Sequence, residues 1–447
     1  MFPHNFKRSL VTHRISNAWM FLVFVVIGLG SVAPGSVAPG QAADWSRFRG
    51  PNGSAVSDDR GVPTDWSDSK NLVWKADLPG PGSSSPIIVG ERVFVTCYSG
   101  YGISRSDEGD LKQLQRHLVC VSLKDGKILW DKSIASKQSE DRYSGFLRDH
   151  GYATSTPASD GERVYVFCGK TGVVAFDLEG KELWQTSVGT GSAMMGWGSG
   201  SSPILYRDTV IVNAAAESKS LIALDKKTGK QAWRSDADSI YGSWATPVLV
   251  DVPNGKTELV LNAPYEMWGF DPDNGEFLWF AEGIQDSTIC GSLVARDGIV
   301  YAVGGRSGSA VAVKAGGRDD VSKSHVVWKK SLTSYVPSPV LAGDRILSVN
   351  ERGIVGCLDA KTGEQLFQQR LSNAGGVYAS PVVIGGKAYI VTRENGTFVM
   401  DLSGKGEVLT QNKLDDETDF NASPAVADGK LLLRSNRSLY CIANKPQ

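Results

Sequence analysis

The sequence predicts an all-β protein, an eight-bladed β-propeller whose blades each contain four short strands. Three observations support this prediction: a repeat of 42 to 46 residues, a four-strand pattern inside each repeat, and a strand ahead of the first repeat that the last repeat lacks. Repeats of this length with four strands each are typical of propeller blades.

Each repeat begins with an anchor, a Ser or Thr followed by Pro and a short apolar strand. Successive anchor prolines are 71, 46, 44, 92, 42 and 43 residues apart. The interval of 92 residues is two periods of 46, and the missing anchor is Ser292-Leu293, where Leu takes the place of Pro. The chain therefore contains eight units. The anchor prolines are Pro86, Pro157, Pro203, Pro247, Pro339, Pro381 and Pro424.

Within a unit, short β-rich runs alternate with Gly-containing turns, which is the pattern of successive hairpins. A fourth strand begins near a Trp in most units, and Phe367 and Leu409 take this position in units six and seven. The Trp residues are Trp130, Trp184, Trp233, Trp279 and Trp328.

The N-terminal strand is expected to close the ring. The eighth unit ends at residues 440–442, before its fourth strand, whereas residues 71–75 resemble a fourth strand without a unit. We therefore predict that the N-terminal strand completes the last blade, which removes an exposed sheet edge. The predicted organisation is a signal peptide over residues 1–43, an N-terminal extension over 44–70 and a single propeller domain over 71–443.

The first 43 residues have the features of an export signal. Lys7, Arg8 and Arg14 precede an apolar run over residues 19–29 that is short for a membrane span. Cleavage is expected near Ala42 or Ala43, and an uncleaved N-terminal anchor is the alternative. No later stretch is apolar enough to cross a bilayer, so we expect an exported, periplasmic or extracytoplasmic protein with no transmembrane segment in the mature chain.

Charge and cysteine content restrict the function further. Without residues 1–43 the chain has 44 basic and 48 acidic residues, a net charge of −4, which argues against a nucleic-acid partner. Cys120, Cys357 and Cys441 share a repeat position that other units fill with Ala or Gly, so we expect buried thiols. A disulfide between Cys97 and Cys120 remains an alternative. We expect a monomer.

The two faces of the propeller differ in their loops. Connections between strands one and two, and between strands three and four, are mostly tight turns such as Asp160-Gly161 and Asn274-Gly275. Connections between strands two and three, and between blades, are long, and they include two insertions over residues 98–117 and 133–151. We call this second face the long-loop rim and the first the short-turn face. Function is expected on the long-loop rim.

Aromatic and basic side chains on the long-loop rim are the candidate site for a protein partner or a small ligand. Aromatic residues just before the anchors are expected to point into the central channel, and arginines are expected around it. The alternative is that the rings only plug the channel. The aromatic candidates are Tyr152, Trp197, Tyr241, Trp244, Tyr335, Tyr378 and Phe420, and the basic ones are Arg306, Arg352, Arg393 and Arg434.

One repeated motif resembles a known family. The pattern Ala-x-Asp-x-x-Thr-Gly-Lys-x-x-Trp occurs over residues 223–233 and again, with substitutions, over residues 357–367. It resembles the tryptophan-docking repeat of pyrroloquinoline quinone (PQQ) propellers, and the likeness extends over about residues 70–443. The repeat is shared by quinoprotein dehydrogenases and by non-catalytic outer-membrane assembly propellers of the BamB type. The opening residues 44–53 are similar to exported proteins with a PQQ-like domain.

The dehydrogenase branch of this resemblance implies PQQ, a calcium ion held by Glu and Asn, and a catalytic Asp. The chain lacks the adjacent Cys-Cys pair common in those enzymes, and no Glu, Asn and Asp set matches their motif. We therefore predict a binding or scaffold protein without catalytic residues, metal ligands or a cofactor. The alternative is a PQQ- and calcium-dependent alcohol or sugar dehydrogenase.

Overall fold

The structure is a computed structural model that describes residues 45–444 except residues 137 and 254. The predicted signal peptide and its cleavage site lie outside the described residues. Residues 45–444 belong to one compact unit. In this part of the chain no helix is long and apolar enough to cross a membrane.

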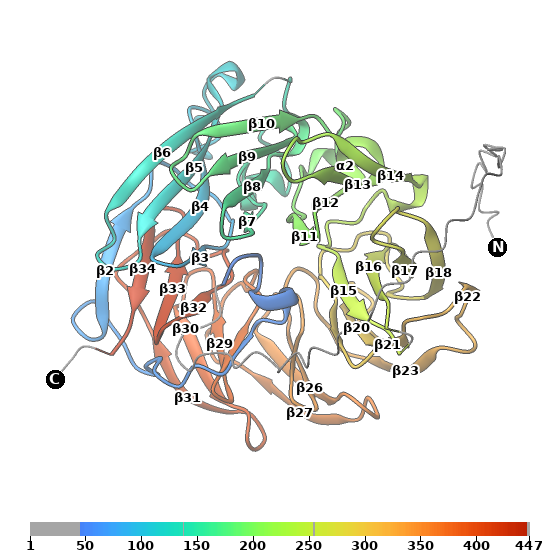
Figure 1. Ribbon diagram of the computed structural model, residues 1–447. Coiled ribbons are helices and arrows are strands. Elements are labelled where there is room, and N and C mark those ends of the chain that lie inside the picture. The colour runs from blue at the N-terminus through green and yellow to red at the C-terminus, as the bar shows by residue number, and fades with distance from the viewer. Residues whose placement is uncertain (1–44, 137, 254, 445–447) are drawn as a thin grey trace, which may run out of the picture. The chain divides into compact units, whose positions relative to one another are not determined.

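Eight sheets form the blades of a propeller, as predicted (Figure 1). Blade one contains β3 (Ile87–Val89), β4 (Arg92–Ser99), β5 (Gln115–Ser122) and β6 (Ile128–Ala135). Blade two contains β7 (Ala158–Ser159), β8 (Arg163–Phe167), β9 (Val173–Asp177) and β10 (Glu182–Thr186). Blade three contains β11 (Ile204–Tyr206), β12 (Thr209–Ala214), β13 (Ser220–Asp225) and β14 (Gln231–Asp236). Blade four contains β15 (Val248–Asp251), β16 (Thr257–Ala263), β17 (Glu266–Phe270) and β18 (Phe277–Glu282). Blade five contains β19 (Val294–Arg296), β20 (Ile299–Gly304), β21 (Ser309–Lys314) and β23 (Val326–Ser331).

Blade six contains β24 (Val340–Ala342), β25 (Arg345–Val349), β26 (Ile354–Asp359) and β27 (Gln365–Arg370). Blade seven contains β28 (Val382–Ile384), β29 (Lys387–Val391), β30 (Thr397–Asp401) and β31 (Glu407–Asn412). Blade eight contains β32 (Ala425–Ala427), β33 (Lys430–Arg434), β34 (Ser438–Ile442) and β2 (Leu72–Asp77). The helices are short: α1 (Leu147–His150), α2 (Ala215–Ser218), η1 (Pro51–Gly53), η2 (Leu111–Gln113), η3 (Gly169–Thr171), η4 (Met194–Gly196) and η5 (Asp238–Ile240).

The predicted closure of the ring is confirmed. Strand β2 pairs antiparallel with β34, and Trp74 lies opposite Cys441 in that register. The N-terminal strand therefore supplies the outermost strand of the last blade. This pairing leaves β34 with neighbours on both sides, so that no edge of blade eight interrupts the ring.

The anchor residues form a continuous hydrogen-bonded belt around the axis. The backbone N–H of each anchor Ser or Thr donates to the hydroxyl oxygen of the equivalent residue in the next blade, and all eight bonds are 2.9 or 3.0 Å long. Ser292 belongs to this belt although Leu replaces the anchor proline, which confirms the count of eight units. The belt consists of Ser85, Thr156, Ser202, Thr246, Ser292, Ser338, Ser380 and Ser423.

The contact between the outer strand of one blade and the next blade explains why the repeat contains a Trp and a Gly. The indole N–H of Trp184 donates to the carbonyl of Lys226 in the next blade at 3.0 Å, and a Cβ on Gly229 would lie 2.5 Å from the same ring. Glycine is required there both by its positive φ of 69° and by this close contact. Trp74, Trp130, Trp233 and Trp328 dock in the same way.

Blade four departs from this docking rule. Its Trp279 donates to Glu258 Oε2 at 2.7 Å, within the same blade. The connection between β21 and β23 is an insertion that includes β22 (Asp319–Asp320), and β22 pairs in parallel with the outer strand β18. This extra strand was not predicted, because the sequence pattern indicates only short turns on the short-turn face.

Blade seven also departs from the rule, because Leu409 stands where the other blades have Trp or, in blade six, Phe367. Trp66 of the N-terminal extension is 2% exposed and stacks on Tyr389, with ring centroids 6.2 Å apart and planes 10° apart. The backbone N–H of Trp66 donates to Asn412 Oδ1 at 3.0 Å. An indole from outside the repeat therefore supplies the packing that the repeat lacks at this blade.

The N-terminal extension crosses the short-turn end of the channel. Its strand β1 (Val56–Ser57) pairs in parallel with β28 of blade seven. The extension also contacts the innermost residues of blades one, two, four and six, so it acts as a base that ties the blades together. These hydrogen bonds join Trp45 to Ile88, Ser46 to Ser159, Asn52 to Leu249, Arg49 to Pro339 and Ala55 to Val383.

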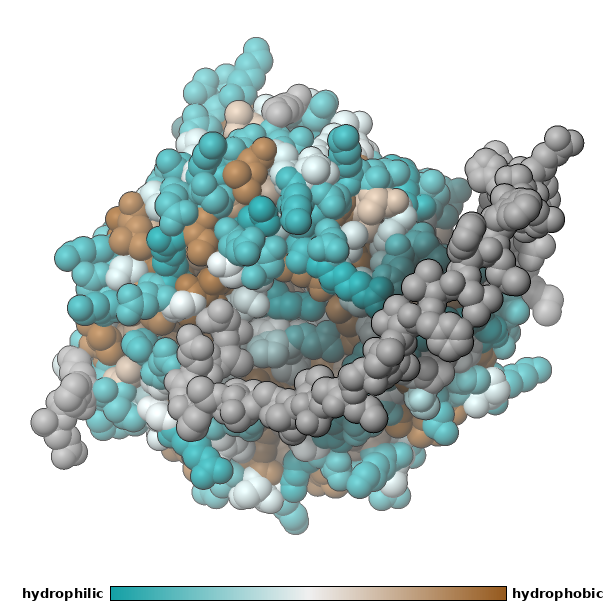
Figure 2. Space-filling view, viewed as in Figure 1, coloured by the Kyte–Doolittle hydropathy of each residue, from teal (hydrophilic) through white to brown (hydrophobic). Residues whose placement is uncertain are grey.

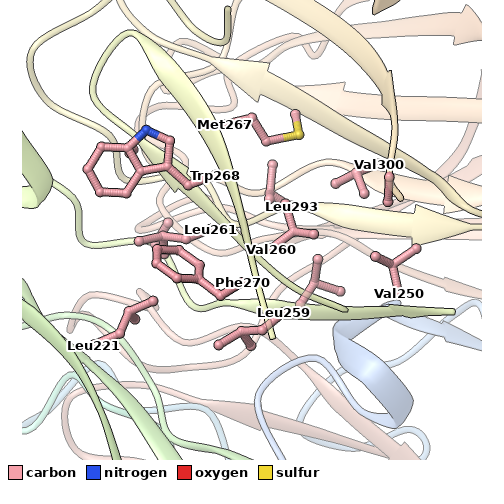
Figure 3. Close-up of a cluster of buried hydrophobic side chains, with 14 of the residues drawn as sticks. Leu221, Val250, Leu259, Val260, Leu261, Met267, Trp268, Phe270, Leu293 and Val300 are labelled. Atoms are coloured by element: carbon pink, nitrogen blue, oxygen red, sulfur yellow. The ribbon is translucent and has the colours of Figure 1, made fainter. Parts of the chain in front are cut away.

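Apolar cores between neighbouring blades hold the ring together. Figure 3 shows part of one buried apolar cluster, which extends across blades three to five and includes Leu221 of blade three, Leu261 and Phe270 of blade four, and Val300 of blade five. The six cysteines are free thiols, and five of them are buried. Cys97 lies opposite His117 and Cys120 opposite Phe94 in the register of β4 and β5. The alternative disulfide between Cys97 and Cys120 is therefore wrong.

Candidate functional site

The candidate site is a cavity of about 160 Å³ on the propeller axis, which we call the axial cavity. The belt residues line it, together with Phe48 of the N-terminal extension. Its walls are aromatic and come from separate loops of the long-loop rim. The wall rings are Phe146, Trp197, Trp244, Tyr335 and Tyr378, and each of them is partly exposed.

The wall rings on one side of the cavity pack against one another. Trp197 lies edge-on to Phe146 with centroids 4.7 Å apart, and its ring is 5.6 Å from that of Trp244. The indole N–H of Trp244 donates to the carbonyl of Gly198 at 2.7 Å. These contacts hold the rings in fixed orientations, so the cavity wall is preorganised.

His150 fastens the second insertion to this wall. Its Nε2 lies 2.8 Å from the carbonyl oxygen of Trp197 and must donate to it, because a carbonyl only accepts. Its Nδ1 is then the acceptor, and it lies 2.6 Å from the Thr154 hydroxyl. Burial lowers the pKa of His150, so the ring is neutral at pH 7. We assign this histidine a positioning role.

Two of the predicted arginines stack on tyrosines of the cavity wall. The guanidinium of Arg306 lies 4.2 Å from the ring centroid of Tyr335 and donates to its hydroxyl at 2.8 Å. Arg393 lies 4.5 Å from the centroid of Tyr378 and pairs with Asp419 at 2.6 Å. Cation–π contacts of this kind fix both partners. Arg352 is exposed, and its nearest carboxylate, Glu351, is 3.8 Å away.

The structure brings four of the seven predicted aromatic residues to the axial cavity: Trp197, Trp244, Tyr335 and Tyr378. The expectation that Tyr152 and Phe420 reach it is wrong. Tyr152 packs with Tyr98, Tyr101 and Tyr143 beneath the insertions. Phe420 stacks on Tyr440 in an inter-blade core.

Tyr241 and Arg434 also lie away from the cavity. Tyr241 is outside its lining and donates to the carbonyl of Ser192. Arg434 is 1% exposed, and its guanidinium donates to the carbonyl and hydroxyl of Ser84, so it cannot serve as a surface charge. Burial lowers the pKa of Arg434. Position before an anchor or in a rim loop does not decide on which side of the blade a side chain lies.

Buried ion pairs dock the second insertion onto blades one and two. Glu140 accepts from Arg116 at 3.0 Å, and both side chains are less than 10% exposed. Asp141 accepts from Lys170 at 2.8 Å and from the Ser192 hydroxyl at 2.6 Å. The insertion is therefore a fixed part of the rim, and it brings Phe146 and His150 to the axial cavity.

Glu217 is a buried carboxyl beside these ion pairs. It lies on α2, is 4% exposed, accepts from the Ser199 hydroxyl through Oε1, and has no hydrogen-bond partner at Oε2. Arg116 and Lys170 lie around the same small cavity, with Glu140 and Asp141 paired to them. Burial, with a smaller contribution from the charges of Glu140 and Asp141, raises the pKa of Glu217 to about 7.

A Glu217→Gln variant is expected to gain stability relative to the parent as pH rises from 5 to 8. The raised pKa means that the folded state binds this proton more tightly than the unfolded chain, so the parent loses stability between pH 4.5 and 7. The relative gain is roughly 3 kcal/mol, since each pKa unit corresponds to 1.36 kcal/mol. Urea unfolding at both pH values measures it. The exposed Glu179→Gln is the control, and a difference independent of pH would contradict this assignment.

Three exposed apolar side chains on the long-loop rim were not predicted. Met195 is 75% exposed, Ile103 58% and Tyr265 51%, whereas the other exposed large apolar side chains of the described residues lie on outer strands. Met195 and Tyr265 have φ of 56° and 66°, in the left-handed region that costs non-glycine residues about 1 to 2 kcal/mol. Strained, exposed apolar residues of this kind gather at binding sites. Figure 2 shows only small, separate apolar patches on the face in view.

The described residues do not fit the quinone and calcium site implied by the dehydrogenase branch. Asp149 is the carboxylate that lines the axial cavity, and it is paired with Arg105 at 2.8 Å. The amide of Asn421 donates to the backbone carbonyl of Asp149, and no Glu in the described part of the chain lines the axial cavity with it to form a calcium site. Across residues 45–444, apart from 137 and 254, no three His, Cys, Asp or Glu side chains form a group able to hold a metal ion.

By sequence, the chain matches proteins of the outer-membrane assembly branch. The family model described as "Outer membrane protein assembly factor BamB" matches residues 115–369 and 322–435. An outer membrane protein assembly factor BamB of Burkholderia pseudomallei is 24% identical over 352 residues, 76% of this chain and 71% of that protein.

Solved structures show the fold on both branches. BamB of Moraxella catarrhalis superposes with a TM-score of 0.60 at 16% identity, covering 84% of this chain and 98% of that one. A europium-containing methanol dehydrogenase superposes with a TM-score of 0.61 at 12% identity, covering 90% and 98%. At these identities the likeness concerns the fold alone. Since the family model spans more than half of the sequence, the chain belongs to the family of the outer membrane protein assembly factor BamB.

Proposed function

We propose that this protein is an exported, non-catalytic binding protein that holds a protein partner on its long-loop rim during outer membrane protein assembly. The similarity to outer membrane protein assembly factors suggests the process. The observation that supports the proposal is the set of Ile103, Met195 and Tyr265, three exposed apolar side chains on one rim. The chain is proposed to act as a monomer on the periplasmic side, after removal of the signal peptide near Ala42 or Ala43.

The rim has the properties of a protein-binding surface. The second insertion is docked by the buried pairs of Glu140 with Arg116 and of Asp141 with Lys170, so a partner meets a preformed surface. Arg352 and Arg306 add exposed charge around the apolar residues. Protein interfaces usually have apolar contacts at their centre and charged groups at their periphery.

Glycine substitutions separate binding from stability. Tyr265→Gly and Met195→Gly remove an apolar contact and also relieve a left-handed backbone, so stability is expected to stay the same or to rise by up to about 1 kcal/mol. Partner binding is expected to fall about tenfold or more, as for an interface side chain worth over 1 kcal/mol. The control is Asp297→Gly, which makes the same backbone change at φ 52° on the short-turn face.

Photo-crosslinking identifies the partner in its own cell envelope. A benzoylphenylalanine at position 265 is expected to crosslink to a component of the outer-membrane assembly machinery, identified by mass spectrometry, and Met195→Gly is expected to reduce that product. The same residue at position 297 is expected to give no such product. Equal crosslinking from both faces, or products unrelated to outer-membrane assembly, would overturn the proposal.

A further inference from the structure

The base of the axial cavity carries a ring of hydroxyl donors. Each belt oxygen accepts one backbone N–H, and the belt hydroxyl protons have no hydrogen-bond acceptor among the described residues. All eight belt residues line the axial cavity. The bonds that close the propeller therefore leave up to eight O–H groups free to turn toward the axis.

The walls above this ring are mainly aromatic, and they also include the ion-paired carboxylate of Asp149 and the amide of Asn421. Trp197 and Trp244 lie on one side, and Tyr335 and Tyr378 on others, while Phe48 lies at the short-turn end. The wall hydroxyl of Tyr335 is already engaged by Arg306. A ligand that satisfies both features has an aromatic ring for the walls and an acceptor atom for the belt.

The volume of the cavity restricts the ligand to a single ring. A cavity of about 150 Å³ accommodates benzene, and the axial cavity has about 160 Å³. One six-membered ring with one small substituent fills this space, whereas a fused three-ring system exceeds it.

We propose that the axial cavity is a binding site for a single aromatic ring that carries a carbonyl oxygen, with the ring against Trp197 and Trp244 and the oxygen on the belt hydroxyls. The acceptor is an amide or a carboxylate. The exposed guanidinium of Arg306, which stacks on the wall tyrosine Tyr335, favours entry of the anionic form, whereas Arg393 is paired with Asp419 and Asp149. This site is separate from the exposed apolar residues of the proposed partner surface, so either proposal can fail without the other.

A matched pair of fluorinated compounds tests the ring and the acceptor separately. Fluorine NMR of 4-fluorobenzamide and 4-fluorotoluene against the folded mature chain reports binding of each without interference from the protein's tryptophans. The amide is expected to bind about tenfold more tightly than the toluene, as one buried hydrogen bond allows. Equal affinities, or no binding of either compound at millimolar concentration, would overturn the proposal.

Two variants locate the site. Ser292→Ala removes one of the eight belt hydroxyls and is expected to lower the affinity for the amide while leaving the toluene affinity unchanged. A merely structural role of Ser292 would lower both affinities equally. Val336→Trp places an indole in the cavity and is expected to abolish binding of both compounds. Ser307→Ala, on an exposed rim residue, is the control.

The remaining outcomes also decide the matter. If thermal melting shows that the Ser292→Ala variant does not fold, two measurements still test the site. They are the binding of the two compounds to the parent chain and the loss of their binding in Val336→Trp. Retained binding in Val336→Trp contradicts it. 4-Fluorobenzoate binding more tightly than the amide identifies a carboxylate ligand.

Discussion

A chain that lacks residues 44–77 is expected not to form the propeller. The deletion removes β2, so β34 becomes an exposed edge, and it removes the docking of Trp74 against blade one. It also removes the hydrogen bonds by which the extension joins the inner ends of five blades. No other part of the chain can supply these contacts, so the expected product is aggregated or unfolded.

Circular dichroism, size-exclusion chromatography and thermal melting of the truncated chain measure this effect. The reference is the chain that begins at residue 44. A synthetic peptide of residues 44–77 added during refolding is expected to restore a cooperative melt, because it returns the missing strand and base. A truncated chain that melts at the reference temperature would show that the closure contributes nothing to the ring.

Trp66→Ala is expected to destabilise the folded protein by about 3 to 5 kcal/mol, the usual loss for a fully buried Trp. The indole is 2% exposed and stacks on Tyr389 between blades seven and eight. Its removal opens a cavity where the repeat has no Trp of its own. Urea unfolding of the variant and the parent measures the loss.

The matched control for this variant lies in the repeat itself. Leu409 occupies the position of the docking Trp but is 41% exposed, so Leu409→Ala is expected to cost less than about 1 kcal/mol. This order is the reverse of what the repeat alignment alone predicts. A larger loss for Leu409→Ala than for Trp66→Ala would contradict the assignment of the docking role to Trp66.

Much of the fold was predictable because it follows from local periodicity. Four strands per period, tight Asp-Gly turns and a small side chain opposite each Trp are all near neighbours in sequence or in register, so they leave a repeated mark. The closing strand was predictable by counting, since one unit lacked a strand and one strand lacked a unit. Strand β22 and the substitution of Trp66 for a docking Trp were not, because each joins segments far apart in the chain.

The candidate site was predictable only in outline. The long-loop rim and four wall residues, Trp197, Trp244, Tyr335 and Tyr378, were identified from their place before an anchor. Tyr152 and Phe420 have the same sequence context but point into packed cores, and Arg434, the last residue of β33 in blade eight, is buried too. The side of a blade that a loop residue faces depends on the path of its loop and on neighbouring insertions, which no repeat pattern encodes. The exposed Met195 and Tyr265 left no sequence signal at all.

The sequence by itself determined the class of fold, the number of blades, the closure of the ring and the face on which function is sought. These depend on a repeated local pattern of hydrophobic strands and turns. The tertiary structure decided which rim residues meet around the axis, how the insertions are held, and that the anchor Ser and Thr residues form a single belt of hydroxyls. The belt depends on all eight blades at once, because each of its hydrogen bonds crosses from one blade to the next.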